Sequence, residues 1–170
     1  MPLGKNPPFE VNCVVEVPKG GTNKYEYDEE VGAFKLDRAL YEAVFFPAEY
    51  GFIPQTLNKK DGDPLDVMVL STFPTFPGCL VSCRPIGILR LVDSGEDDDK
   101  IIAVSANDPR FDEIKELEDL PIHIRKEIKN FFGNYAELQT DKKIKIDGWS
   151  GKDKAHELIK QASKDFQEKK

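Results

Sequence analysis

Short apolar runs separated by glycine and proline turns fill the first two thirds of this chain. In Val11–Val17 the side chains alternate between two faces, as in a strand, and a Pro-Lys-Gly-Gly turn follows. The aromatic segment 45–54, with a proline near each end, instead predicts an irregular packed segment. Further runs that predict strands lie at 24–28, 33–37, 65–70, 79–92 and 100–104. Many short strands with such turns favour a small barrel or sandwich.

The last third of the chain changes to the apolar spacing of helices. Pro121 suits a first helical turn, and apolar residues then recur at helical spacing up to Tyr135. Ser150 and Asp153 resemble a capping box ahead of a second apolar stripe at 155–166. The length predicts a single domain over residues 1–170. Its class is α+β, mainly β, with two main helices, the longer at the C-terminus.

Composition excludes several classes of protein. The formal net charge of −7 argues against a general binder of nucleic acid, but divalent ions could reverse the sign of an acidic site for a phosphate substrate. No apolar run approaches the ~20 residues of a membrane helix, and the start lacks a signal-peptide core. Three cysteines and two histidines disfavour a disulfide framework, a zinc site and a Ser-His-Asp or Cys-His enzyme. We therefore expect a cytoplasmic protein with no nucleic-acid or membrane partner.

Three aspartates lie within the six residues D-G-D-P-L-D at 61–66. Like charges this close repel each other unless a cation lies between them. Gly62 permits a tight turn, and Pro64 holds Asp63 in an extended conformation. Asp66 then opens an apolar strand, which gives it a fixed platform. Mg²⁺ prefers such oxygens, so the loop predicts a metal site, with a solvated turn as the alternative; an EF-hand is excluded because its glycine and glutamate positions are not matched.

A second acidic segment, D-S-G-E-D-D-D-K at 93–100, lies between two strongly apolar strands. Alone, such a charge run is typical of an exposed hairpin turn, but a turn between barrel strands also places side chains at the barrel mouth. Lys24 lies two residues from Glu26, and Arg38 follows Asp37. These pairs are either surface ion pairs of little energetic value or groups that flank a metal-bound phosphate.

Taken together, the segments resemble the soluble inorganic pyrophosphatases of the metal-dependent, barrel-type family (family I), in its short prokaryotic-length form. D-G-D-P-L-D matches the signature loop of that family, and D-S-G-E-D-D-D-K matches its second acidic motif. E-V-P-K-G, N-K-Y-E-Y-D, L-D-R, F-F-P-A-E-Y-G-F-I-P-Q-T, C-R-P-I-G and F-F-G-N-Y align in the same order, from about 11 to 166. The resemblance implies an OB-like five-stranded barrel that hydrolyses pyrophosphate to two orthophosphates. It also implies several Mg²⁺ ions, with Mn²⁺ or other divalent ions as substitutes, and a homohexamer.

The resemblance also implies a role for each matching residue. Asp63 looks like the general base that acts on a metal-bound water. The residues that look like metal ligands are Asp61, Asp66, Asp93 and Asp98, of which Asp66 and Asp98 would bridge two ions. Glu16 and Glu26 look like outer acidic residues. The groups that look like phosphate contacts are Lys24, Arg38, Tyr50, Lys100 and Tyr135.

Two positions depart from the family pattern. Phe46 stands where the family usually has tyrosine, and Ala136 stands where it usually has a phosphate-binding lysine. The second change removes a charged contact typically worth ~1.5–3 kcal/mol, for which Lys142 or Lys143 could substitute. Three alternatives stay open: a metal-dependent phosphohydrolase of organic polyphosphates, a catalytically impaired relative, and an oligonucleotide-binding barrel. The predicted acidic mouth disfavours the last of these.

Overall fold

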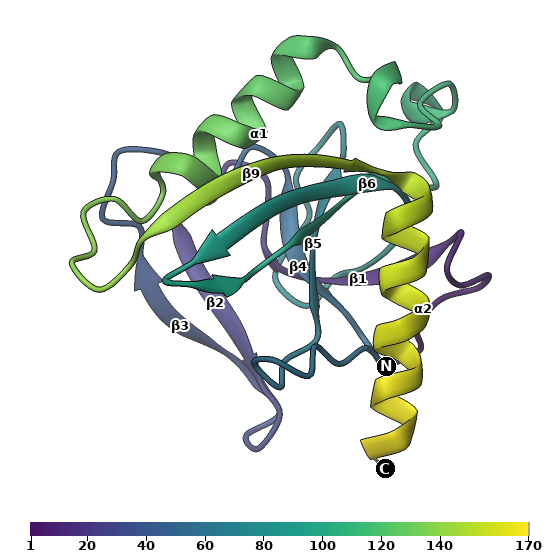
Figure 1. The fold of residues 1–170 in the computed structure, drawn as a ribbon, viewed down its shortest axis with the longest axis horizontal. Coiled ribbons are helices and arrows are strands. Elements are labelled where there is room, and N and C mark those ends of the chain that lie inside the picture. Colours follow the sequence, from purple (N-terminus) through teal and green to yellow (C-terminus); the bar gives the residue numbers. More distant parts are fainter. Residues whose placement is uncertain (170) are drawn as a thin grey trace.

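A computed structural model describes residues 1–169 and has a closed ring of strands at its centre (Figure 1). The five strands of the ring are, in order, β1 (Val11–Val17), β4 (Glu49–Ile53), β5 (Leu65–Leu70), β8 (Lys100–Ser105) and β6 (Leu80–Asp93). Pairing of β1 with β6 closes the ring. Only β5 and β8 run parallel among these pairs. The ring confirms the expected five-stranded barrel.

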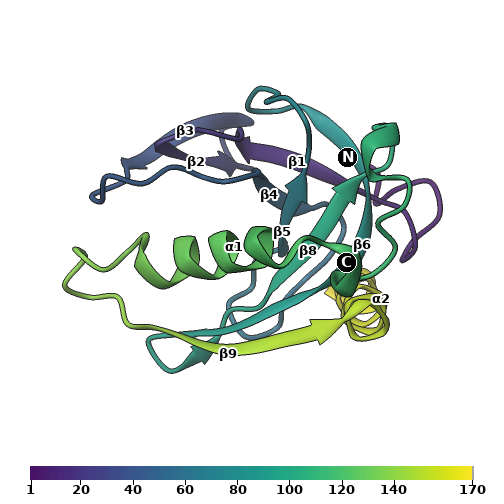
Figure 2. The ribbon, with the colours of Figure 1, turned by 90° about the horizontal axis from the view of Figure 1, so that it is seen from above.

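The remaining elements surround this ring. They are the hairpin β2 (Asn23–Asp28) and β3 (Ala33–Ala39), β7 (Glu96–Asp97), the 3₁₀ helices η1 (Pro109–Phe111) and η2 (Leu117–Asp119), α1 (Ile122–Asn134), β9 (Ile144–Gly151) and α2 (Lys152–Lys169). Figures 1 and 2 show α2 along one side of the barrel and the β2–β3 hairpin on the opposite side. The longer helix is the C-terminal one, as expected. Among residues 1–169, no helix combines the length and apolarity that a membrane crossing needs.

Strand β5 packs against a hydrophobic cluster on each of its faces. Leu65, Val67 and Val69 join the cluster that includes α2 residues, whereas Met68 and Leu70 join the cluster that includes α1 residues. Burial on both faces explains why this segment is an almost unbroken apolar run. Because side chains alternate along a strand, Asp66 lies on the α1 face, at the end where that cluster meets the surface.

Two segments differ from the expectation from sequence. The stretch 45–54 contains a regular strand, β4, which is buried at every residue and therefore shows no alternation. The last third contains a strand as well as helices, because β9 pairs with β6 from Gly87 to Asp93. The predicted capping role of Ser150 is wrong, since Ser150 lies inside β9 opposite Ile88 and α2 begins at Lys152.

Gly51 allows β4 to lie close to β1. It pairs with Val15 on one side and Val67 on the other. A Cβ atom at this position would lie 1.9 Å from the backbone oxygen of Val14, which cannot move without breaking the barrel. Gly133 in α1 is the opposite case, since a Cβ there would meet only the Ile146 Cδ1 atom, at 3.7 Å.

We expect Gly51→Ala and Gly133→Ala to change stability in opposite directions. Gly51→Ala should lower the free energy of unfolding by about 3 kcal/mol or more, through overpacking against backbone. Gly133→Ala should raise it by up to ~1 kcal/mol, because alanine is the better helix former. Urea unfolding of both variants beside the parent chain measures the difference. Equal stability of the parent and Gly51→Ala would contradict the close approach of β1 and β4.

Candidate active site

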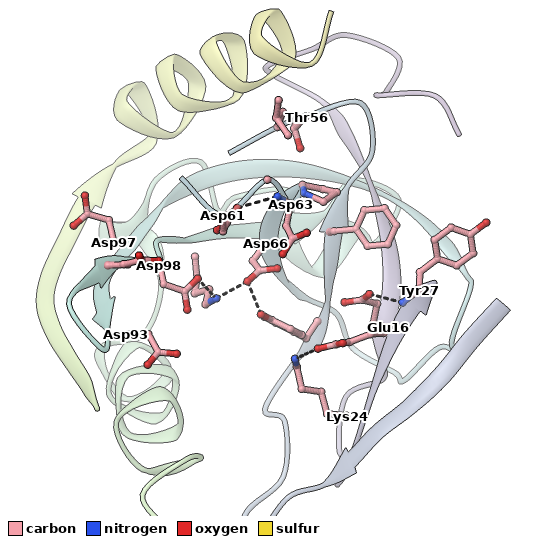
Figure 3. Close-up of a pocket in the computed structure, with 18 of the residues that line it drawn as sticks. Glu16, Lys24, Tyr27, Thr56, Asp61, Asp63, Asp66, Asp93, Asp97 and Asp98 are labelled. Carbon is pink, nitrogen blue, oxygen red and sulfur yellow. Dashed lines mark hydrogen bonds and ion pairs between the residues drawn. The ribbon is translucent and has the colours of Figure 1, made fainter. Parts of the chain in front are cut away.

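A cavity of about 780 Å³ opens at the end of the barrel beside the β2–β3 hairpin. It is lined by residues from β1, the hairpin, the 56–66 segment, the β6–β8 region and the end of α1. All twelve residues singled out from the sequence line it: Glu16, Lys24, Glu26, Arg38, Tyr50, Asp61, Asp63, Asp66, Asp93, Asp98, Lys100 and Tyr135. Figure 3 shows Asp61, Asp63 and Asp66 close together, with Asp98 and Asp93 across from them.

Lys100 lies at the centre of this arrangement. Its side chain is 3% exposed, and its ammonium donates hydrogen bonds to Asp66 and, at 2.6 Å, to Asp98. The Tyr50 hydroxyl donates a second hydrogen bond to Asp66, at 2.7 Å. Burial alone would lower the pKa of Lys100, but the charges of Asp66 and Asp98 outweigh burial and raise the pKa above its ordinary value. Lys100 is therefore a permanent cation between two carboxylates.

Backbone hydrogen bonds fold the 58–66 loop so that its acids face the cavity. Gly62 has φ +86°, and its N–H donates to the Asn58 carbonyl at 2.8 Å. The Asp63 N–H donates to Asp61 Oδ1 at 2.9 Å, and Asn58 Nδ2 donates to Asp61 Oδ2 at 2.7 Å. Burial raises the pKa of Asp63, and the charges of Asp61 and Asp66 raise it further. A carboxylate with a raised pKa accepts a proton more readily near neutral pH.

Helix α2 holds the beginning of the same loop. The Leu57 N–H donates to the Ala162 carbonyl at 2.9 Å, and Lys59 Nζ lies 2.7 Å from Asp165 Oδ1. Asp165 is buried, and the hydrogen bond from Lys59 keeps its pKa below the usual range. Two further α2 residues, Phe166 and Lys169, line the cavity itself. The loop is thus fixed to an element about 100 residues later in the chain.

The β2–β3 hairpin supplies two cations. Lys24 pairs with Glu26, and Arg38 pairs with Asp37. Arg38 has a further donor, since its Nε atom is buried and has no hydrogen-bond partner within residues 1–169. Lys24 and Arg38 face each other across the hairpin, where they are Cα partners. The side chains of both are 18% exposed, so their charges act at close range on whatever enters the cavity.

Glu16 reaches the cavity from the end of β1. The Tyr27 N–H donates to Glu16 Oε1 at 2.9 Å, which fixes the carboxylate against β2 (Figure 3). Burial raises the pKa of Glu16 to about 7, and the nearby charge of Asp66 contributes to the increase. Glu16 is consequently near its midpoint of protonation at neutral pH.

Carboxylate oxygens are the ligands that hard divalent ions prefer, so the donor set suits such ions. In the described part of the chain, no three His, Cys, Asp or Glu side chains converge closely enough to hold an ion as they stand. Ammonium groups are the cations that these carboxylates contact: Lys100 bridges Asp66 and Asp98, and Lys142 lies 2.7 Å from Asp93. The carboxylates thus already bind cationic groups, and an arriving divalent ion would compete with them.

Several cavity residues were not found by sequence reasoning. Lys142 was proposed only as one of two alternatives, and the structure shows it in the cavity lining. Tyr27 and Phe166 lie in segments noted in the sequence, N-K-Y-E-Y-D and the apolar stripe at 155–166, but neither they nor Lys169 was singled out as a cavity residue. The two departures from the family pattern lie elsewhere: Phe46 and Ala136 are buried in the core cluster that includes Tyr50 and Tyr135. Neither replacement residue belongs to the cavity lining.

Comparisons with known proteins agree with this arrangement. A family model described as inorganic pyrophosphatase matches residues 13–167. The chain is 51% identical over 160 residues to an inorganic pyrophosphatase of Geobacillus stearothermophilus, covering 94% of this chain and 96% of the relative. It is 46% identical over 166 residues to an inorganic pyrophosphatase of Picrophilus torridus, covering 98% and 93% of the two chains.

Solved structures show the same fold. The crystal structure of inorganic pyrophosphatase from Thermus thermophilus matches with a TM-score of 0.95 and 43% identity, covering 98% of this chain and 97% of that one. The structure from Coxiella burnetii matches with a TM-score of 0.92 and 36% identity, covering 98% and 99%. The barrel, the acidic cavity and these relatives together show that the chain belongs to the inorganic pyrophosphatase family.

Proposed function

We propose that this chain is an enzyme that hydrolyses inorganic pyrophosphate to two orthophosphates. The observation that supports the proposal most directly is the gathering of Asp61, Asp63, Asp66, Asp93 and Asp98 with several cations in one cavity. Paired acids and bases of this kind suit a small polyanion that must be both neutralised and hydrolysed. Membership of the inorganic pyrophosphatase family supports the same substrate.

The cofactor that we propose is Mg²⁺, in several copies, with Mn²⁺ or other divalent ions as substitutes. Asp61, Asp66, Asp93 and Asp98 would hold the ions, and the family resemblance suggests that Asp66 and Asp98, which both contact Lys100, would each serve two of them. When bound, such ions offset the charge of pyrophosphate and lower the pKa of the attacking water. Glu16 and Glu26 would act as outer acids on the hairpin side of the cavity.

Asp63 is the proposed general base. It lies between Asp61 and Asp66 in the sequence, and the ion pairs of Lys100 are made with Asp66 and Asp98 rather than with Asp63. Its raised pKa, which burial and its acidic neighbours cause, suits a group that takes a proton from water near neutral pH. Removal of that proton lets the water oxygen attack phosphorus while the leaving phosphate departs.

The remaining groups would bind the two phosphates. Lys24 and Arg38 extend from the hairpin, and the unpartnered Arg38 Nε supplies a donor for a phosphate oxygen. Tyr50, Tyr135 and Lys100 line the same cavity, and the two tyrosine rings pack in the core cluster that includes α1 residues. Charge-assisted hydrogen bonds from such groups would stabilise the negative charge that develops on the departing phosphate. We further propose one domain over residues 1–170, from the chain length, a cytoplasmic location, from the scarcity of cysteine, and a homohexamer, from the family resemblance.

Release of phosphate from pyrophosphate tests the function. The purified chain should release phosphate when Mg²⁺ is present, and excess chelator should abolish the release. ATP and tripolyphosphate at the same concentration should be hydrolysed much more slowly, because the family to which the chain belongs is described as inorganic pyrophosphatase. Absence of metal-dependent release would overturn the proposal. Preferential hydrolysis of ATP would favour a phosphohydrolase of organic polyphosphates.

Asp63→Asn separates catalysis from metal binding. The amide keeps the shape of the loop but cannot accept a proton from water, so kcat should fall by about 10²–10⁴-fold. The affinity for Mg²⁺, measured by calorimetry without substrate, should change by less than about threefold, because Asp63 is not a proposed ligand. Losses of similar size in kcat and in metal affinity would contradict the role of base.

Glu16 should make the metal-free chain less stable as pH rises. Its pKa is about 7 in the folded chain and near 4.5 in the unfolded chain, so the folded state binds more protons between these values. The stability that this proton provides is present at pH 4.5 and is lost by pH 7.5. Glu16→Gln should remove about 2 kcal/mol of this pH dependence, measured by urea unfolding in chelator. Glu29→Gln, which changes an exposed cavity residue in the turn between β2 and β3, is the matched control and should keep the parent slope.

A further inference from the structure

Lys142 has a fixed backbone position beside the cavity. It lies just before β9, and its neighbours are bonded to the turn after β6. The Ser94 N–H donates to the Lys143 carbonyl at 2.9 Å, and the Lys143 N–H donates back to Ser94 Oγ at 3.3 Å. Ser94 Oγ also lies 3.3 Å from the Asp141 carbonyl oxygen. These bonds hold residues 141–143 against the turn that carries Asp93.

The side chain of Lys142 contacts Asp93, which is a proposed metal ligand. Its ammonium is 2.7 Å from Asp93 Oδ2, while Ser94 Oγ donates to Oδ1 of the same carboxylate at 2.8 Å. The Asp93 side chain is 13% exposed and the Lys142 side chain is 38% exposed. Asp93 is therefore held firmly, whereas Lys142 has solvent around its stem and room to turn.

Lys142 differs in this respect from the other lysine that occupies proposed ligands. Lys100 is 3% exposed and bridges two carboxylates, so it has nowhere else to go. Lys142 has a single carboxylate partner among the described residues. A divalent ion bound at Asp93 would repel the Lys142 ammonium, which lies 2.7 Å from Oδ2 of that carboxylate, so the two cations compete for Asp93.

We propose that Lys142 is a mobile counter-ion of the site. It occupies Asp93 when the site holds no divalent ion, and it moves onto a phosphate oxygen of the substrate or product once Asp93 is taken. The inference rests on the proposed function and extends it to a residue with two successive partners. It gives Lys142 a double effect: it weakens ion binding at Asp93 and strengthens phosphate binding in the loaded site.

The adjacent lysine provides a natural comparison. Lys143 is exposed and does not belong to the cavity lining, and its recorded contacts with Ser94 are made by its backbone. Ala136 carries no charge that could contact a phosphate, and its side chain is buried among apolar residues of the α1 cluster. The choice between Lys142 and Lys143, which sequence leaves open, is therefore decided in favour of Lys142 by the position of its side chain.

Calorimetric titrations without turnover test the inference. Lys142→Ala should bind Mn²⁺ about two- to fivefold more tightly than the parent, which is the gain expected from removal of one partly exposed ion pair. In the Mn²⁺-loaded protein, the same variant should bind inorganic phosphate about tenfold more weakly. Lys143→Ala should match the parent in both titrations. Lys142→Arg should restore phosphate binding, because the guanidinium is also a cationic donor.

A double-mutant cycle locates the first effect. In an Asp93→Asn background, Lys142→Ala should no longer tighten Mn²⁺ binding, because the competition has already been removed. Weaker Mn²⁺ binding by Lys142→Ala, or unchanged phosphate affinity, would overturn the inference. Because neither titration needs hydrolysis, these failures are distinct from a parent chain that binds Mn²⁺ and phosphate yet releases nothing from pyrophosphate.

Discussion

A buried ammonium group determines how the cavity end of this barrel is built. Lys100 is almost fully withdrawn from water, and an unpaired charge in that position would cost several kcal/mol. Its requirement for partners draws Asp66, from β5, and Asp98, from the loop before β8, toward one point. Since β5 and β8 are paired in parallel, both acids emerge at the same end of the sheet. The acidic centre is thus a consequence of neutralising one cation in the metal-free protein.

The two faces of the barrel strands have different surroundings: one is wholly packed in the core, and the other leads to the cavity. One face of β5 and β8 packs toward α2 with aliphatic side chains alone, including Val67 and Ile101. The other packs toward α1 around an aromatic cluster, in which the rings of Phe46 and Phe131 lie 4.7 Å apart. The cavity lies where this second face reaches solvent, so the Tyr50 ring belongs to the core while its hydroxyl donates a hydrogen bond to Asp66 in the cavity. Ring packing of this kind fixes the hydroxyl in place.

Much of the barrel and the gathering of the site followed from sequence. β1 and β5 have local patterns strong enough to predict their bounds, and Gly62 indicated the turn between Asp61 and Asp63. β4 was missed because all its residues are buried, so only tertiary pairing distinguishes it from an irregular segment. β9 was missed for a related reason. Its charged and apolar residues give no clear local strand pattern, and the strand is defined by its pairing with β6. Which of two adjacent lysines enters the cavity depends on backbone bonds to Ser94, which no local pattern records.

The contact between α2 and the acidic loop has a consequence for the order of assembly. The loop that begins at Leu57 is made early in synthesis, but its backbone partner Ala162 and its ion-pair partner Asp165 come about 100 residues later. A growing chain can form β1, β4 and β5 and still leave Lys59 without its partner. The three loop aspartates then repel one another, and only the hydrogen bonds within the loop itself oppose that repulsion. On the ribosome, the barrel can therefore precede the site, and competence for catalysis arrives only when α2 has emerged and docked.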